Sequence, residues 1–162
     1  MREIELIADI KKRCAESLKD LRFGTADKNI PKRAPSIIAG FYIKDENSAF
    51  VSENVEEVAP FVIVRPKAGE DVARDEFRVQ VEIIIQVYND DPAMIGHMDC
   101  LLAMNRIRAN IQQYPILENK FHYDGGWKWE LNDEQPVPNW EIQILSNWLI
   151  PNTQRIDVAE YI

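Results

Sequence analysis

The chain has 162 residues, 46% of them hydrophobic and 28% charged, a composition typical of one folded domain over residues 1–162 whose core needs no disulfide or metal staple. Its formal net charge is −8 and its basic stretches are no longer than Lys11-Lys12-Arg13, so specific nucleic-acid binding, which needs cations gathered on one face, is not expected. No segment approaches the roughly 20 apolar residues of a membrane-spanning helix, and the N-terminus lacks a signal-peptide pattern, so we expect a soluble protein that stays in a cytoplasm and has no membrane partner.

The first predicted element is an amphipathic helix over residues 3–22. Its apolar residues recur at spacings of three or four, as a single buried helix face requires. Gly24, just beyond, is a typical stop signal, and residues 24–35 have the composition of a loop. The apolar face of this helix contains Ile4, Ile7, Ile10, Cys14, Leu18 and Leu21.

Two short strands are predicted next, over residues 36–43 and 59–65. The polar, acidic segment 44–58 between them is interpreted as an exposed loop or a short hairpin. Residues 66–76 are predicted to form a second acidic loop, with Gly69-Glu70-Asp71 at its tip.

The clearest signal is the alternation over residues 77–88, which predicts a long antiparallel strand with one buried face. Its opposite face is polar, except that Ile84 and Tyr88 interrupt it. The face predicted to be buried carries Phe77, Val79, Val81, Ile83, Ile85 and Val87.

A second helix is predicted over residues 92–114, with Asp91 as its N-cap and Pro92 in its first position. Pro115 ends it. The face predicted to be buried contains His97, Cys100, Leu101, Met104, Ile107, Ile111 and Tyr114, widened near the start by Met94 and Met98.

Two strands close the chain, over residues 125–131 and 140–150, and Leu145 and Leu149 interrupt the polar face of the second. The order of elements predicts an α+β fold, a largely antiparallel β-sheet of about five strands with two helices packed on one face. Four tryptophans on these strands are expected in the shared core, with a protein interface or a stacking platform as alternatives. They are Trp127, Trp129, Trp140 and Trp148.

The residues that could carry chemistry form no recognisable catalytic or metal pattern. His97 and Cys100 are three residues apart, but both lie on the stripe that should be buried, so packing explains them better than catalysis. Cys14 and Cys100 are expected as free thiols, and no spacing of Cys and His matches a zinc site. We therefore expect no enzyme, no cofactor and no metal, although carboxylates distant in sequence could still meet in a fold.

A set of segments covers roughly residues 35–151, and none of them is a catalytic signature. They are Pro35-Ser36-Ile37-Ile38-Ala39-Gly40-Phe41-Tyr42, Pro60-Phe61-Val62-Ile63-Val64-Arg65-Pro66, Gly69-Glu70-Asp71, the strand through Tyr88, the helix with Leu101 and Ile107, Trp129, Pro136-x-Pro138-x-Trp140 and Trp148-x-x-Pro151. In this order and spacing, the segments resemble the tail terminators, a family of tail-completion proteins encoded by prophages of Gram-positive bacteria.

The resemblance implies a structural protein that forms a ring, typically hexameric, on the end of the tail tube. Such a ring stops growth of the tube and presents a surface to the head. The implied partners are other copies of the chain, the tail tube protein and the head–tail connector protein. The implied location is the host bacterial cytoplasm during assembly and then the virion tail, with DNA passing through the lumen without specific binding.

A partly apolar outer sheet face suits a surface that a neighbouring subunit covers. The candidate interface residues are therefore Ile84, Tyr88, Leu145 and Leu149, together with Glu70 and Asp71 of the second acidic loop. Another neck or head-closure component, or a small α+β ligand-binding domain of unrelated cellular function, remains an alternative.

Overall fold

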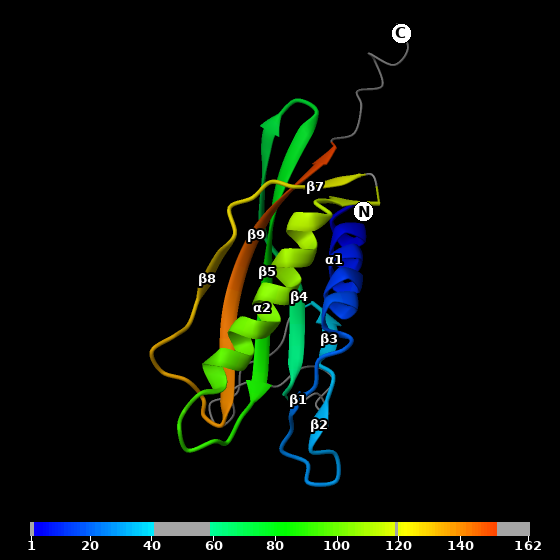
Figure 1. The fold of residues 1–162 in the computed structure, drawn as a ribbon. Helices are drawn as coiled ribbons and strands as arrows, with labels where there is room; N and C mark the ends of the chain where they lie inside the picture. The colour runs from blue at the N-terminus through cyan, green and yellow to red at the C-terminus, as the bar shows by residue number, and fades with distance from the viewer. Residues whose placement is uncertain (1, 41–58, 119, 152–162) are drawn as a thin grey trace, which may run out of the picture.

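Two helices lie side by side on one face of a curled, mostly antiparallel sheet (Figure 1). The computed structural model describes residues 2–40, 59–118 and 120–151. The helices are α1 (Arg2–Leu18) and α2 (Gly96–Gln113). The predicted α+β class is therefore confirmed. The predicted loop at 44–58, the end of the strand predicted over 36–43 and the chain after 151 lie outside the described residues.

The main sheet has seven strands rather than the expected five, in the order β3-β4-β5-β9-β7-β6, with β8 also paired to β9. Only β3 and β4 run parallel. The strands are β3 (Ser36–Ala39), β4 (Phe61–Ala73), β5 (Glu76–Tyr88), β6 (Ile116–Leu117), β7 (Phe121–Tyr123), β8 (Lys128–Glu130) and β9 (Asn139–Pro151). The unexpected β6 and β7 have two and three residues, too few for any alternation to reveal them.

A separate two-stranded hairpin follows α1. Its strands, β1 (Phe23–Gly24) and β2 (Lys32–Arg33), are antiparallel and occupy the segment that was predicted as loop. Hydrogen bonds close the turn between them, from Thr25 N–H to the Pro31 carbonyl at 3.1 Å and from Ile30 N–H to the Asp27 carbonyl at 3.2 Å.

The core lies between the helices and the inner face of the sheet. The predicted inner face of β5 is confirmed: Val79, Val81, Ile83, Ile85 and Val87 are buried there, and Phe77 packs against them. From α1 the core receives Leu6, Ile7, Ile10, Cys14 and Leu18, whereas Ile4 at the helix start is exposed.

The β4–β5 hairpin is longer than predicted, because residues 66–73 belong to β4 and form no loop. Pairing continues to Ala73 opposite Glu76, with register shifts between Pro66 and Ala68 and between Asp71 and Ala73. In Figure 1 this hairpin extends past the helices. Side chains on this part of β4 are exposed, so no apolar alternation marks it as a strand.

Helix α2 begins at Gly96, so the prediction that Asp91 caps it was wrong. Asp91 instead stabilises a turn: its Oδ1 accepts from Ala93 N–H at 2.9 Å and its carbonyl accepts from Met94 N–H at 3.0 Å. Met94 then has a φ of 58°, which no helix residue adopts, and the helix starts only after it. The predicted stripe is also too wide, because Met94, Met98 and Tyr114 are exposed.

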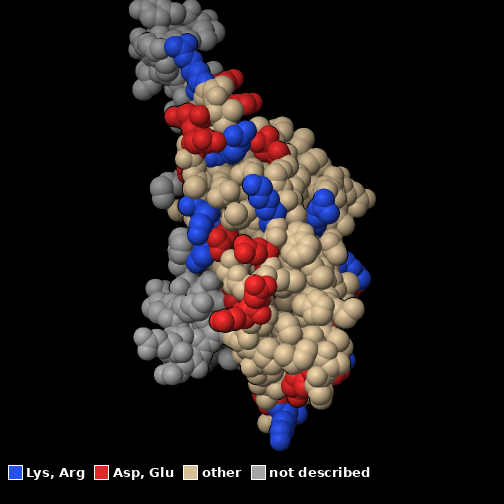
Figure 2. Space-filling model, turned by 90° about the vertical axis from the view of Figure 1, so that its left-hand side faces the viewer, with Lys and Arg blue, Asp and Glu red and all other residues tan. Residues whose placement is uncertain are grey.

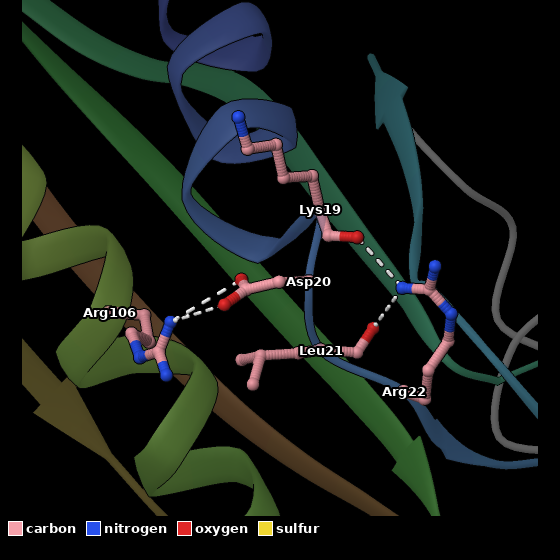
Figure 3. Close-up of polar contacts among 5 residues, drawn as sticks. All are labelled: Lys19, Asp20, Leu21, Arg22 and Arg106. Carbon is pink, nitrogen blue, oxygen red and sulfur yellow. Dashed lines mark hydrogen bonds and ion pairs between the residues drawn. The ribbon is translucent and has the colours of Figure 1, made fainter.

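Charged side chains join the C-terminal half of α2 to the C-terminal half of α1 and the residues that follow it. Arg106 of α2 lies 3.3 Å from Asp20, and the Arg22 guanidinium donates to the carbonyls of Lys19 and Leu21, at 2.7 and 2.9 Å, just after α1 (Figure 3). Arg13 of α1 donates to the carbonyls of Asn110 and Tyr114 at the end of α2. The Tyr114 carbonyl is among those that a helix end leaves without an intrahelical partner. None of the helices in the described part of the chain is long and apolar enough to cross a membrane.

Candidate functional site

The thiols and histidines lie where packing explains them. Cys100 is fully buried, and burial, followed by the nearby Asp99 and Glu141 carboxylates, raises the pKa of its thiol. Burial raises the pKa of the Cys14 thiol to about 12. The His97 ring packs on Trp140, with centroids 6.0 Å apart. Both thiols are therefore held protonated and out of contact with solvent, which is the state of a structural cysteine.

Within residues 2–40, 59–118 and 120–151, no group of three or more His, Cys, Asp or Glu side chains could hold a metal ion. Several of the acidic residues instead form ion pairs, among them Glu5, Asp20 and Glu70. The most buried carboxylate is Glu82, on the outer face of β5, which pairs with Arg65 at 2.7 Å and with Lys67 at 3.3 Å. Glu82 thus has a cationic partner on each of two neighbouring β4 residues, which accounts for its burial as a structural ion pair.

Ile84 is not on an open surface, which corrects its assignment as an interface residue. It is fully buried, in a second and smaller cluster with Phe61 and Ile63 against which Ile38 packs. Its neighbour Gln86 is also buried. The outer face of the central sheet is thus not the open polar surface that the alternation suggested.

The structure brings two of the candidate interface residues together. Glu70 and Leu149 stand in one cross-strand row on either side of Arg78, which forms ion pairs with Glu70 at 3.0 Å and with Asp124 at 2.8 Å. Because the hairpin continues through this row, Glu70 and Asp71 belong to strand β4 and not to a loop tip.

The remaining candidates lie apart from this row. Leu145 is four residues further back on β9, half-buried and in register with Glu82. Tyr88 is at the far end of β5, ten residues from Arg78, so it cannot share one small interface with Leu149. That Tyr88, Leu145 and Leu149 contact a neighbouring subunit stays a prediction.

Tyr88 lines a groove of about 710 Å³ between the β1–β2 hairpin and the start of α2. The groove has an apolar part and charges of both signs. Its lining includes Leu21, Phe23, Leu102, Asp27, Lys28, Lys32, Asp90 and Asp99.

An exposed apolar area near the start of α2 was missed from the sequence. Met94, Met98 and Val137 are 50%, 58% and 44% exposed, although the two methionines had been assigned to the buried stripe. Trp129 on β8 is 49% exposed as well, whereas Trp140 and Trp148 are buried as expected and Trp127 is half-buried. Figure 2 looks onto the side that carries β8 and shows a broad uncharged area in its lower half, with acidic side chains at its border.

A scan against protein-family models and a search of curated proteins found no match to this chain.

Proposed function

We propose that this protein is a structural assembly component of a phage tail, which caps the tail tube, ends its elongation and provides the surface to which the head is joined. In this role it acts as a ring of identical subunits and not as an enzyme. The ring contacts the tail tube protein on one side and the head–tail connector protein on the other.

The observation that carries the proposal is the ordered set of segments that resembles the tail terminators. In the fold, several of these segments lie on strands of one sheet: Phe61 to Pro66 and Gly69 to Asp71 on β4, and Trp140 and Trp148-x-x-Pro151 on β9. A likeness spread over neighbouring strands concerns the scaffold as a whole. It agrees with the fold that the resemblance implies, an antiparallel sheet that carries two helices.

Exposed apolar side chains support an assembly role. A surface with Met94, Met98 and Val137 largely open to solvent is of the kind that protein partners cover. The long β4–β5 hairpin supports it too, because exposed charged strands beyond the core offer a second surface for a neighbouring protein.

The experiment is to add the purified protein to isolated tail tubes of the phage whose genes surround its own, and to image the tubes by electron microscopy. We expect extra density at one end of each tube and none along its sides. Bare tube ends at saturating protein would overturn the proposal.

Binding of a small ligand is the second candidate function, favoured by the groove beside Tyr88. Its volume of about 710 Å³ is within the range of small-molecule sites. Its lining, however, is rich in charged residues of both signs, whereas such sites are mostly apolar. A ligand-binding protein would leave tube ends bare in the same experiment.

A further inference from the structure

Two segments at the start of α2 and β9 form one acidic surface with an apolar centre. The backbone N–H of Asn89 donates to the Pro138 carbonyl at 2.9 Å, so the segments 89–99 and 132–138 are held together. Between them they contain five carboxylates and no Lys or Arg. We call this the acidic surface, defined by Asp91, Met94, Met98, Asp133, Glu134 and Val137, all of which are exposed.

The β1–β2 hairpin has the opposite charge. Residues 22–33 contain four Lys or Arg and one Asp, and the turn exposes Ile30, which is 52% open to solvent, between Lys28 and Lys32. The turn is fixed internally, since Asp27 Oδ1 accepts from Asn29 N–H at 2.9 Å in addition to the backbone bonds across it. The basic hairpin is therefore a preorganised apolar tip with cations beside it.

Among the described residues, no ion pair joins these two surfaces. A groove of about 710 Å³ lies between the basic hairpin and segment 89–99, with Lys28 and Lys32 on one wall and Asp90 and Asp99 on the other. The exposed side chains of Lys28, Lys32, Asp133 and Glu134 can therefore meet opposite charges on another copy of the chain.

The positions of the two surfaces suit a head-to-tail contact. Figure 1 shows the β1–β2 hairpin on one side of the lower end of the molecule, and the loops that lead into α2 and β9 on the other side. A contact between different surfaces of identical subunits is heterologous, and it closes into a ring when the rotation between subunits allows. Apolar side chains at the centre with charges at the rim are the usual anatomy of such an interface.

Strand addition beside β4 is the competing mode of association. Within the described residues, strand β3 pairs with the Phe61–Val64 part of β4. Arg65, Pro66 and Lys67 follow, with a register shift between Pro66 and Ala68. A proline, a lysine and a bulge are the features that protect an edge from pairing, so the edge is the weaker candidate.

We propose that the basic hairpin of one copy docks on the acidic surface of the next, with Ile30 against Met94, Met98 and Val137, and Lys28 and Lys32 against Asp133 and Glu134. This inference rests on the proposed function, because a closed ring needs two different surfaces on each subunit. The inference identifies those two surfaces. The charged rim makes the association weaker as salt is raised.

The test is a charge exchange followed by sedimentation velocity over a concentration series. One variant carries Asp133→Lys and Glu134→Lys, and the other carries Lys28→Glu and Lys32→Glu. Each variant alone sets like charges against each other, so we expect its association to weaken at least about tenfold relative to the unmodified protein. An equal mixture pairs opposite charges at every interface and should restore association.

A matched control carries Lys11→Glu and Lys12→Glu on the exposed side of α1, which changes net charge as much as the hairpin variant does. We expect it to associate like the unmodified protein. Ile30→Gln tests the apolar centre without a change of charge and should also weaken association.

The inference is overturned if the unmodified protein stays monomeric throughout, if either charge variant alone associates normally, if the mixture does not reassociate, or if the α1 control loses association too. The result is separable from the tail role, because no phage component is present. A protein that associates as described but leaves tube ends bare keeps this interface and loses the proposed function. A protein that binds tube ends but fails the charge exchange keeps the proposed function and loses this interface.

Discussion

Gly96 lies directly against the indole of Trp140, so close that a β-carbon at Gly96 would overlap Cδ1, Nε1 and Cγ of the ring. The ring is held by other contacts as well: its Nε1 donates to the Asn89 carbonyl at 3.3 Å, and His97 packs on it. This arrangement fixes the first turn of α2 to the start of β9, and with it the acidic surface.

Replacing Gly96 with Ala should lower the stability of the fold. Alanine gains roughly 1 kcal/mol in helix propensity over glycine. The overlap, however, includes the base of a buried, multiply held ring, and overpacking of this kind typically costs about 1–3 kcal/mol. We expect a lower midpoint of urea denaturation, whereas Asn105→Ala at an exposed position of the same helix should leave it nearly unchanged. An unchanged midpoint for Gly96→Ala would show that the ring moves freely.

Both faces of β5 should prove sensitive to truncation at their centre. Ile83→Ala, on the inner face, and Ile84→Ala, on the outer face, should each cost about 2–5 kcal/mol, because both side chains are fully buried. Gln80→Ala, half-buried on the outer face, should cost far less. These values follow from denaturation curves, and a small cost for Ile84→Ala would place that side chain back on an open surface.

The pH dependence of stability should contain a contribution from Cys14. Burial raises the pKa of its thiol from the ordinary 9.0 to about 12. As pH rises through this window, the unfolded chain loses the proton before the folded chain does, so the free energy of unfolding falls from pH 9 towards about 12. Below pH 9 this contribution is fully present.

The Cys14→Ala variant isolates this contribution. It is less stable than the unmodified protein throughout because it loses a buried side chain, but its stability should decline less steeply across the same alkaline window. Parallel declines for the two proteins would mean that the thiol reaches solvent in the folded state.

The ion pair between Asp20 and Arg106 should be visible in a carboxyl titration. The hydrogen bond from Arg106 lowers the pKa of Asp20, and the stability linked to it is lost as pH falls through that lowered pKa. Arg106→Gln should move the NMR titration midpoint of Asp20 upward, towards its ordinary value. Arg108→Gln, two residues further along α2 and with no ion pair to Asp20, is the control. An unmoved midpoint in Arg106→Gln would contradict the pairing in Figure 3.

The parts of the fold that could be predicted are those with one covered and one open face. The inner face of β5 and most of the α1 stripe are of this kind and were placed correctly. In α1, however, Ile4 is exposed, and Leu6, which was left out of the predicted stripe, is buried. Ile84 was not placed correctly, because a second cluster covers the outer face locally and alternation cannot reveal it. The extension of β4 to Ala73 was not predicted for the opposite reason. Its side chains are exposed, and a strand exposed on both faces has no alternation of apolar and polar residues.

Interaction surfaces are harder to predict, because the sequence does not distinguish an apolar residue in the core from one exposed at a protein–protein interface. Met94 and Met98 were assigned to the core face of the second helix. The turn at Asp91 delays α2, so Met94 lies outside the helix, whereas Met98 lies within it but beside the buried stripe. Glu70 and Leu149 come together only through a register across three strands, which no local pattern contains.

The most direct test of the tail-terminator account is deletion of the gene from the genome that carries it, followed by induction and electron microscopy of the particles. The account predicts tail tubes of irregular, excessive length without heads, restored to uniform tailed particles when the gene is supplied in trans. Particles with heads joined to tails of normal length in the absence of the protein would contradict it.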